Sequence, residues 1–181
     1  ERMVDQGELI PDPAGLTPIE QLSAIRKAVR KLVAQQYEEM ARRLLPALRQ
    51  GGFTLLTPSL LTQAQKNWLS NYFDTQIMPV LTPRMLRRNQ PFPLLAAKRL
   101  YIAVLLQSDK GGAPQLSLVP IPSVLKRVLL LPMGDGIARG ILLEDVVGMF
   151  LGRLFPHMTI LAHTTLRITR NTDFVFDPDS S

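Results

Sequence analysis

Hydrophobic residues change their spacing part-way along this chain of 181 residues. From Pro18 to Pro79 they recur every three or four residues, which is the period of an amphipathic α-helix. From Leu100 onward they form short runs of strand length, separated by glycines and prolines. The switch predicts an α+β fold. We expect a helical hairpin or bundle segment at residues 1–51, then a two-layer α/β unit with a mostly antiparallel sheet at residues 52–181.

Two helix starts stand out in the first part. Thr17-Pro18-Ile19-Glu20 has the spacing of a capping box with proline in the first helical turn, and Thr62 with Gln65 repeats that spacing. The first helix is expected to end near residues 45–50, because Pro46 interrupts its hydrogen bonds and Gly51-Gly52 can terminate it. Its apolar face needs helical partners, since one helix cannot bury such a face alone.

The second part predicts mainly strands. Leu100–Leu106 and Gln115–Ile121 flank a turn with two glycines and are expected to form a β-hairpin. Further elements are expected in chain order: a strand, a loop, a helix with acids in its first turn, and one or two strands from Met158. The expected strand spans Arg127–Leu131, the loop spans Pro132–Gly140 and the helix spans Leu143–Leu154.

The distribution of positive charge indicates which kind of partner the chain would bind. The net charge is +6, and five of the cations lie between Pro83 and Leu100 with no acid among them. Such a field favours polyanions, although a solvated loop would carry the same charges. The chain has no cysteine, which excludes disulfides and thiolate metal sites and suits a reducing cytoplasm. It has no membrane-spanning apolar run, and residues 1–15 lack the apolar core of a signal peptide.

Residues with catalytic potential lack the necessary neighbours. Glycines are not spaced as a phosphate-binding loop, and no cluster of metal ligands is evident. His157 and His163 have no nearby acid, so we expect both to be structural or surface residues. Glu144-Asp145 fits the acidic first turn of a helix. Arg167 and Arg170 would point to opposite faces of a continuous strand, so a single anion clamp does not follow.

Seven short segments, taken together, resemble bacterial polyphosphate kinase. They occur in that family's order and cover nearly the whole chain from about Gly15. They are GLTPIEQL at 15–22, QKNWLSNYF at 65–73, PVLTP at 79–83, PFPLL at 91–95, IPSVLKR at 121–127, LLEDVV at 142–147 and FPHMTILAHTTLRITRNTD at 155–173.

The resemblance implies the organisation of the chain. Residues 1–51 would be the C-terminal part of the N-terminal helical domain, and residues 52–181 the middle, or head, domain. The parent enzyme would transfer phosphate from ATP to inorganic polyphosphate with Mg²⁺, through a phosphohistidine. Its catalytic histidine and most nucleotide contacts belong to C-terminal domains, so we expect this chain alone to be inactive and to hold no cofactor.

The implied role is assembly and polyanion guidance. Expected partners are inorganic polyphosphate, the C-terminal catalytic domains of the same parent and a second copy in a homodimer or higher oligomer, with no nucleic acid. The parent is expected in the cytoplasm, with membrane association as an alternative. The rival is a free-standing regulatory or nucleic-acid-binding α+β protein that shares only the fold. The candidate contacts with a polyanion or another domain are Arg87, Arg88, Lys98, Arg99, Arg167 and Arg170.

Overall fold

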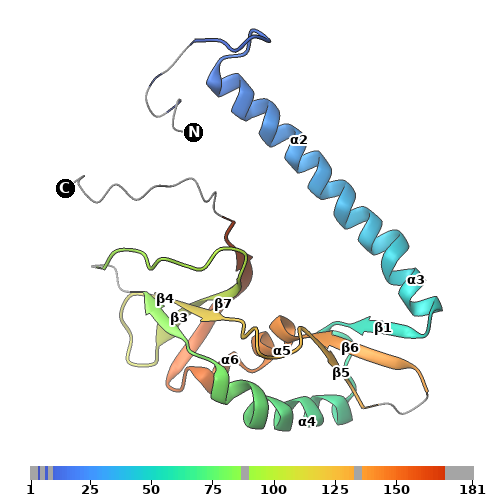
Figure 1. Cartoon of the computed structure of the whole chain (residues 1–181). Coiled ribbons are helices and arrows are strands. Elements are labelled where there is room, and N and C mark those ends of the chain that lie inside the picture. The colour runs from blue at the N-terminus through green and yellow to red at the C-terminus, as the bar shows by residue number, and fades with distance from the viewer. Residues whose placement is uncertain (1–3, 5–6, 8–9, 87–89, 133–135, 170–181) are drawn as a thin grey trace. The chain divides into compact units, whose positions relative to one another are not determined.

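The computed structural model describes residues 4, 7, 10–86, 90–132 and 136–169. The chain divides into two compact units, Glu1–Thr54 and Leu55–Ser181 (Figure 1). The predicted boundary after Gly51 lies just before this division, and its assignment to two named domains stays a prediction. Each unit is considered by itself below.

The first unit is built on one long helix. It consists of α2 (Pro18–Glu39), a π-helical segment η1 (Met40–Leu44) and α3 (Leu45–Gln50). The predicted capping box is present: Thr17 N–H donates to Glu20 Oε2 at 2.8 Å, and Glu20 N–H donates to Thr17 Oγ1 at 3.4 Å. The Thr17 hydroxyl also donates to Glu20 Oε2 at 2.7 Å, and this bond, together with the one from the Thr17 N–H, holds the pKa of the Glu20 carboxyl below its usual range. The helix ends before Gly51, within the predicted range.

The apolar side of this helix is open to solvent in the described structure. Ile25, Leu32 and Leu44 are 56%, 64% and 60% exposed, and Pro18 is the buried residue of α2. Residues 10–54 contain no second helix, so any partner of the predicted hairpin lies outside them. No helix in the described part of the chain is both long and apolar enough to cross a membrane.

A proline follows each of two π-helical segments. In η1 the Leu45 N–H donates to Met40 O, five residues back, immediately before Pro46. In η3 (Phe73–Ile77) the Met78 N–H donates to Phe73 O, immediately before Pro79. A proline ring would clash with the carbonyl four residues earlier, and a wider turn moves that carbonyl away. Pro46 therefore widens the helix rather than ending it.

A four-stranded antiparallel sheet forms the centre of the second unit, in the order β2-β4-β3-β7. Its strands are β2 (Arg84–Leu86), β3 (Leu100–Ser108), β4 (Gln115–Pro120) and β7 (Met158–Arg167). The predicted hairpin is confirmed, with Ile102 opposite Val119 and Leu105 opposite Leu116. The register of β3 with β7 shifts between Leu105 and Leu106, which marks a β-bulge.

A second, three-stranded sheet has the order β1-β6-β5. Its strands are β1 (Phe53–Leu56), β5 (Val128–Leu130) and β6 (Ala138–Leu142). The predicted strand at residues 127–131 is confirmed by β5, which pairs antiparallel with β6. The prediction of a loop over Pro132–Gly140 is wrong for residues 138–140, which begin strand β6. The glycine at 140 indicates a loop in the sequence, but in the structure Gly140 is buried within this strand.

Short helices complete the second unit and cover the core. They are α4 (Gln63–Tyr72), α5 (Leu143–Met149) and α6 (Leu151–Leu154), with short 3₁₀ turns η2 (Pro58–Leu60) and η4 (Met78–Val80). The predicted helix at 143–154 is interrupted at Phe150, whose φ and ψ are −112° and 17°. Leu69, Phe73 and Ile77 are fully buried. They pack with Ile102, Val104, Leu106, Val119, Ile141, Val146 and Val147.

The other face of the four-stranded sheet carries a small separate core. Leu95, Tyr101 and Leu118 are buried there, and Leu166 packs against them from β7. Leu95 comes from the segment that leads into β3, and the neighbouring Ala96 N–H donates to Tyr101 Oη at 3.0 Å. This core fixes the segment that carries Lys98 and Arg99.

Candidate functional site

Three of the six predicted contact residues meet at one end of the four-stranded sheet. Lys98 and Arg99 immediately precede β3, and Arg167 ends β7 opposite Leu100. Opposed Cα atoms in such a ladder are about 5 Å apart, so residues 98, 99 and 167 are close neighbours along the backbone. All three side chains are exposed. We call Lys98, Arg99 and Arg167 the basic corner.

Backbone geometry holds the basic corner in place. The Lys98 N–H donates to Ile168 O at 2.7 Å, which joins the end of β7 to the segment before β3. Lys98 has a φ of 62°, in the left-handed region that residues with side chains seldom occupy. Ile168 packs against the small core of Leu95, Tyr101 and Leu118. The corner is thus attached to the sheet and is not part of a free loop.

No described acid of the second unit lies at this end of the sheet. Asp109 follows the far end of β3, roughly 30 Å away at the rise of an extended strand. Glu144 and Asp145 belong to α5, and Asp74 is paired with Arg153. Three cations without a nearby described carboxylate create a positive field at the corner.

The other three predicted contacts, Arg87, Arg88 and Arg170, lie outside the described residues. The last described residue before Arg87 is Leu86, which pairs with Leu116 near the hairpin turn of β3 and β4. The basic corner lies at the opposite end of these strands. Of the six predicted contact residues, the structure describes Lys98, Arg99 and Arg167, and it brings these three together.

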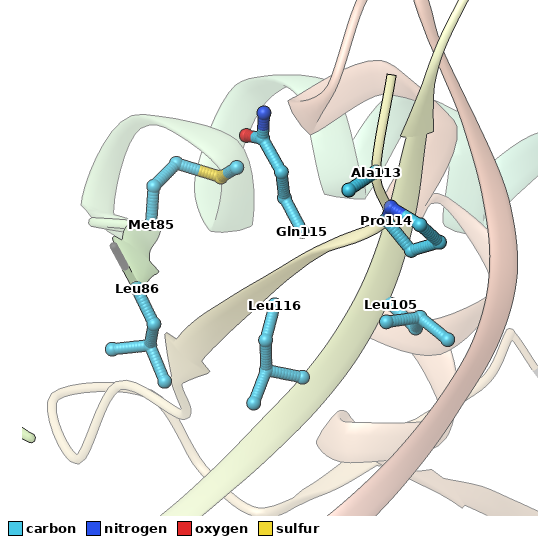
Figure 2. A pocket seen from close by; sticks show the side chains of 7 residues that line it. All are labelled: Met85, Leu86, Leu105, Ala113, Pro114, Gln115 and Leu116. Carbon is cyan, nitrogen blue, oxygen red and sulfur yellow. The ribbon is translucent and has the colours of Figure 1, made fainter. Parts of the chain in front are cut away.

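An apolar hollow of about 720 Å³ lies on the same sheet. Figure 2 shows that Leu86, Leu105 and Leu116 project to one side of the strands, while Met85 and Gln115 project to the other. The three leucines form a row across β2, β4 and β3, as the strand register requires. Ala113 and Pro114 complete the lining, which contains no titratable or nucleophilic group. The hollow offers no acid–base chemistry.

The two histidines do not form a site. His157 lies outside β7 with a φ of 63°, and the bulge in β7 breaks the alternation that would have put it on the same face as His163. The His163 ring lies over Gly148 of α5, where an added Cβ would be 3.3 Å from His163 Cε1. Glycine at this position therefore allows the helix to approach the strand. Among the described residues, no group of three or more acids or histidines could hold a metal ion.

Sequence reasoning missed an ion pair between β5 and α5. Arg127 donates to Glu144 Oε1 from Nε at 2.9 Å and from Nη2 at 2.5 Å, and its carbonyl accepts the Leu143 N–H at 2.7 Å. Glu144 is 6% exposed, and its Oε2 has no hydrogen-bond partner in the described structure. The hydrogen bond to Glu144 raises the pKa of Arg127. The pair fastens the start of α5 and is structural.

Asp145 differs from its neighbour because it lacks such a partner bond in the described structure. Burial raises the pKa of the Asp145 carboxyl, and the negative charge of Glu144 raises it further, while Arg127 acts in the opposite direction. A helix first turn was the predicted role for both acids. Asp145 has no cluster of catalytic groups around it, so its raised pKa is a consequence of packing.

Arg153 performs a similar structural role between α6 and α4. It donates to Asp74 Oδ1 at 2.6 Å and to Ser70 Oγ at 2.7 Å, and its guanidinium lies 4.6 Å from the centre of the Phe150 ring. On α4, the rings of Trp68 and Tyr72 stack with their centroids 5.1 Å apart and pack against the core. These aromatic groups do not form a binding platform.

Comparison with known proteins decides the family. A family model described as the polyphosphate kinase middle domain matches residues 64–181. The chain belongs to the polyphosphate kinase family. The polyphosphate kinase of Bacillus cereus is 38% identical over 172 residues, which are 93% of this chain and 24% of that protein. The one of Halalkalibacterium halodurans is 40% identical over 161 residues, or 88% and 23% of the two chains.

The fold agrees with this assignment. The crystal structure of polyphosphate kinase from Porphyromonas gingivalis superposes with a TM-score of 0.73 and 25% sequence identity, covering 87% of this chain and 26% of that one. The predicted family and the α+β fold class are therefore confirmed. The chain spans about a quarter of the length of the relatives it matches. A protein that shares only the fold is not supported, because the similarity extends to the sequence.

Removing the arginine that pairs with the buried Glu144 should destabilise the protein. Arg127→Met leaves Glu144 buried without its partner, and we expect a loss of about 3 kcal/mol in the free energy of unfolding. The double variant Arg127→Met with Glu144→Met should recover much of that loss. Urea unfolding measures both. Lys126→Met, at the exposed neighbouring position, is the control, and an equal loss in Lys126→Met and Arg127→Met would contradict the assignment.

Asp145→Asn should stabilise the protein at neutral pH. Because the folded state raises the pKa of Asp145, it binds the proton more tightly than the unfolded state does, and stability falls as pH rises from about 3.9 through the folded pKa. The variant escapes this penalty, and its gain should vanish as the pH falls below about 3.9. We expect a gain below about 1 kcal/mol, since the carboxyl is partly exposed. Urea midpoints at both pH values test this, and a gain that persists at low pH would refute it.

Proposed function

We propose that this chain is the portion of a polyphosphate kinase that guides polyphosphate and contributes subunit contacts, without supplying catalytic groups. The parent reaction transfers the terminal phosphate of ATP to polyphosphate, with Mg²⁺ and a phosphohistidine. The observation that carries the proposal is the basic corner on a chain of this family. ATP, Mg²⁺ and the reacting histidine would belong to the C-terminal domains of the same parent.

The chemistry of the basic corner suits a chain of phosphates. Phosphate oxygens are recognised by cations, and arginine can donate two parallel hydrogen bonds to them. Arg99 and Arg167 supply such groups, and Lys98 adds a point charge. All three are exposed and lie on a fixed strand end, so a bound polyanion need not order a loop. This arrangement supports a wall along which polyphosphate passes.

The chemistry of the described side chains supports the non-catalytic part of the proposal. The apolar hollow on the sheet is lined by apolar residues and a glutamine, and the described histidines lie in separate structural settings. Glu144 is engaged by Arg127. The side chains that the structure describes offer positions for binding and assembly rather than for phosphoryl transfer.

The subunit contact would come from the apolar side of the long helix. Ile25, Val29, Leu32, Leu44 and Leu48 are 46–64% exposed there, which leaves a large apolar surface in water. Burying it against the same face of a second copy would stabilise both helices, because most helical stability comes from packing. A homodimer or higher oligomer follows from this arrangement.

Neutralising the basic corner should weaken polyphosphate binding. Replacing Lys98, Arg99 and Arg167 with glutamine removes three phosphate contacts, so the slope of log affinity against log salt should fall by about 2, by analogy with single-stranded nucleic acids. Isothermal titration with long-chain polyphosphate at several salt concentrations measures this.

A matched control separates the corner from overall charge. Replacing the exposed cations Arg49, Lys110 and Lys126 with glutamine removes the same charge from other places. An equal loss of affinity in the two variants would show that the corner is not a specific contact. The same preparations should not turn over ATP with polyphosphate, and turnover by the 181-residue chain would contradict the non-catalytic role.

Polar substitutions on the helix should dissociate the proposed dimer. Leu32→Gln with Leu44→Gln removes two residues that are 64% and 60% exposed on α2 and η1. Light scattering coupled to size exclusion should report a dimer for the wild type and a monomer for this variant. Leu60→Gln with Leu130→Gln is the control, since these leucines are 64% and 65% exposed elsewhere. An unchanged mass in the first variant would exclude this face as the contact.

A further inference from the structure

A second concentration of positive charge lies on α2, away from the predicted contacts. Residues 21–37 contain four cations and no acid. These residues, Arg26, Lys27, Arg30 and Lys31, are all exposed, and none has a hydrogen bond or ion pair to another described residue. They span about 7.5 Å along the helix and about 140° around it. We call them the basic stripe.

The stripe places like charges where they repel one another. Arg26 with Arg30 and Lys27 with Lys31 are each four residues apart, a spacing that brings side chains together on a helix and destabilises it when the charges match. Unpaired charge of this kind calls for an opposite charge from outside the helix. The structure supplies none among its described residues.

The same helix shows how paired arginines look. Arg42 and Arg43 are each four residues after an acid, and their Nη1 atoms lie 2.9 Å from Glu38 Oε1 and Glu39 Oε2. Pairing is therefore present at one end of the helix, and no described acid provides it over the stripe. The contrast indicates that the stripe is reserved for an anion and is not simply a solubilising face.

A hollow beside the stripe offers space for that anion. It has a volume of about 610 Å³ and is lined by Arg26, Lys27 and Arg30 together with Ser23, Ile19, Leu22 and Val4. Three cations and a hydroxyl therefore meet one concave surface. This is the chemistry of a phosphate site: charge-assisted donors plus a neutral hydroxyl donor.

We propose that the basic stripe is a second polyphosphate contact, separate from the basic corner. Four cations within about 7.5 Å suit a linear ligand of closely spaced negative charges better than a single phosphate. This inference depends on the proposed function for the choice of ligand. It adds a binding surface on the helical unit, and bound polyphosphate supplies the charge that the helix lacks.

The test compares two pairs of arginines on one helix. Arg26→Gln with Arg30→Gln removes unpaired cations, and Arg42→Gln with Arg43→Gln removes the paired ones. Binding of long-chain polyphosphate is measured by titration between about 50 and 200 mM salt, with tripolyphosphate and orthophosphate as shorter probes. We expect the first variant to lose on the order of tenfold in affinity for the long chain, with a salt slope lower by about 1.4. The control should keep its affinity within about twofold, since its arginines are already neutralised.

Helix content provides a second readout that is independent of affinity. Without ligand, the first variant should melt at a higher temperature by circular dichroism, because repulsion is relieved, and the control should melt at a lower one. Polyphosphate should increase the helix content of the wild type. A lower melting temperature for the Arg26→Gln and Arg30→Gln variant would overturn the inference, since it would mean that the cations already have an acidic partner in the protein.

The outcomes also separate this inference from the proposed function. No binding of polyphosphate by the wild type would overturn both. Binding that is lost in the basic-corner variant and unchanged in the basic-stripe variant would support the proposed function and overturn the second contact. Equal losses in the Arg26/Arg30 and Arg42/Arg43 variants would also overturn it, because binding would then follow net charge alone.

Discussion

The hydrogen-bonded ladder on both sides of β3 is the constraint on which the second unit depends. Antiparallel pairing with β4 and β7 fixes which side chains point into the core, and Ile102, Val104 and Leu106 fill it from one face. On the other face, Tyr101 joins a small core that holds the segment before the strand. A slip of one residue would exchange these faces and expose the main core. The register therefore sets both the stability of the sheet and the position of Lys98, Arg99 and Arg167.

The arginines and lysines considered above have three kinds of surroundings. Arg127 pairs with Glu144 and fastens the start of α5 to the segment before β5, and Arg153 pairs with Asp74 and joins α6 to η3. Arg42 and Arg43 pair with acids one helical turn away, which stabilises an exposed helix modestly. The cations of the basic corner and the basic stripe have no described acidic partner and are exposed. The first two groups have partners within the protein, and the last group is where we propose that a polyanionic ligand binds.

Much of the fold could be predicted from local sequence signals. Both capping boxes, the hairpin of β3 and β4 and the buried residues of α4 follow from spacing alone, because each depends on contacts within a few residues. Strand β6 could not be predicted, since Gly140 resembled a loop residue and its burial depends on distant neighbours. Three of the six candidate site residues come together through strand pairing, which local patterns do not specify. The basic stripe could not be recognised from the net charge of residues 1–51. Acids at other positions in that range nearly cancel its four cations in the sum.

The π-helical segments have a consequence for how the helices face their surroundings. One additional residue in a turn delays the helix by about 100° of rotation, which brings Leu48 to about 40° from Ile25 around the helix axis instead of about 140°. In the first unit, Leu48 after η1 therefore points in a different direction than a regular helix from Ile25 would give it. A proline at position 46 thus sets the phase of the helix. Replacing that proline would allow the turn to tighten and would rotate α3, with Leu48, away from the side that carries Ile25.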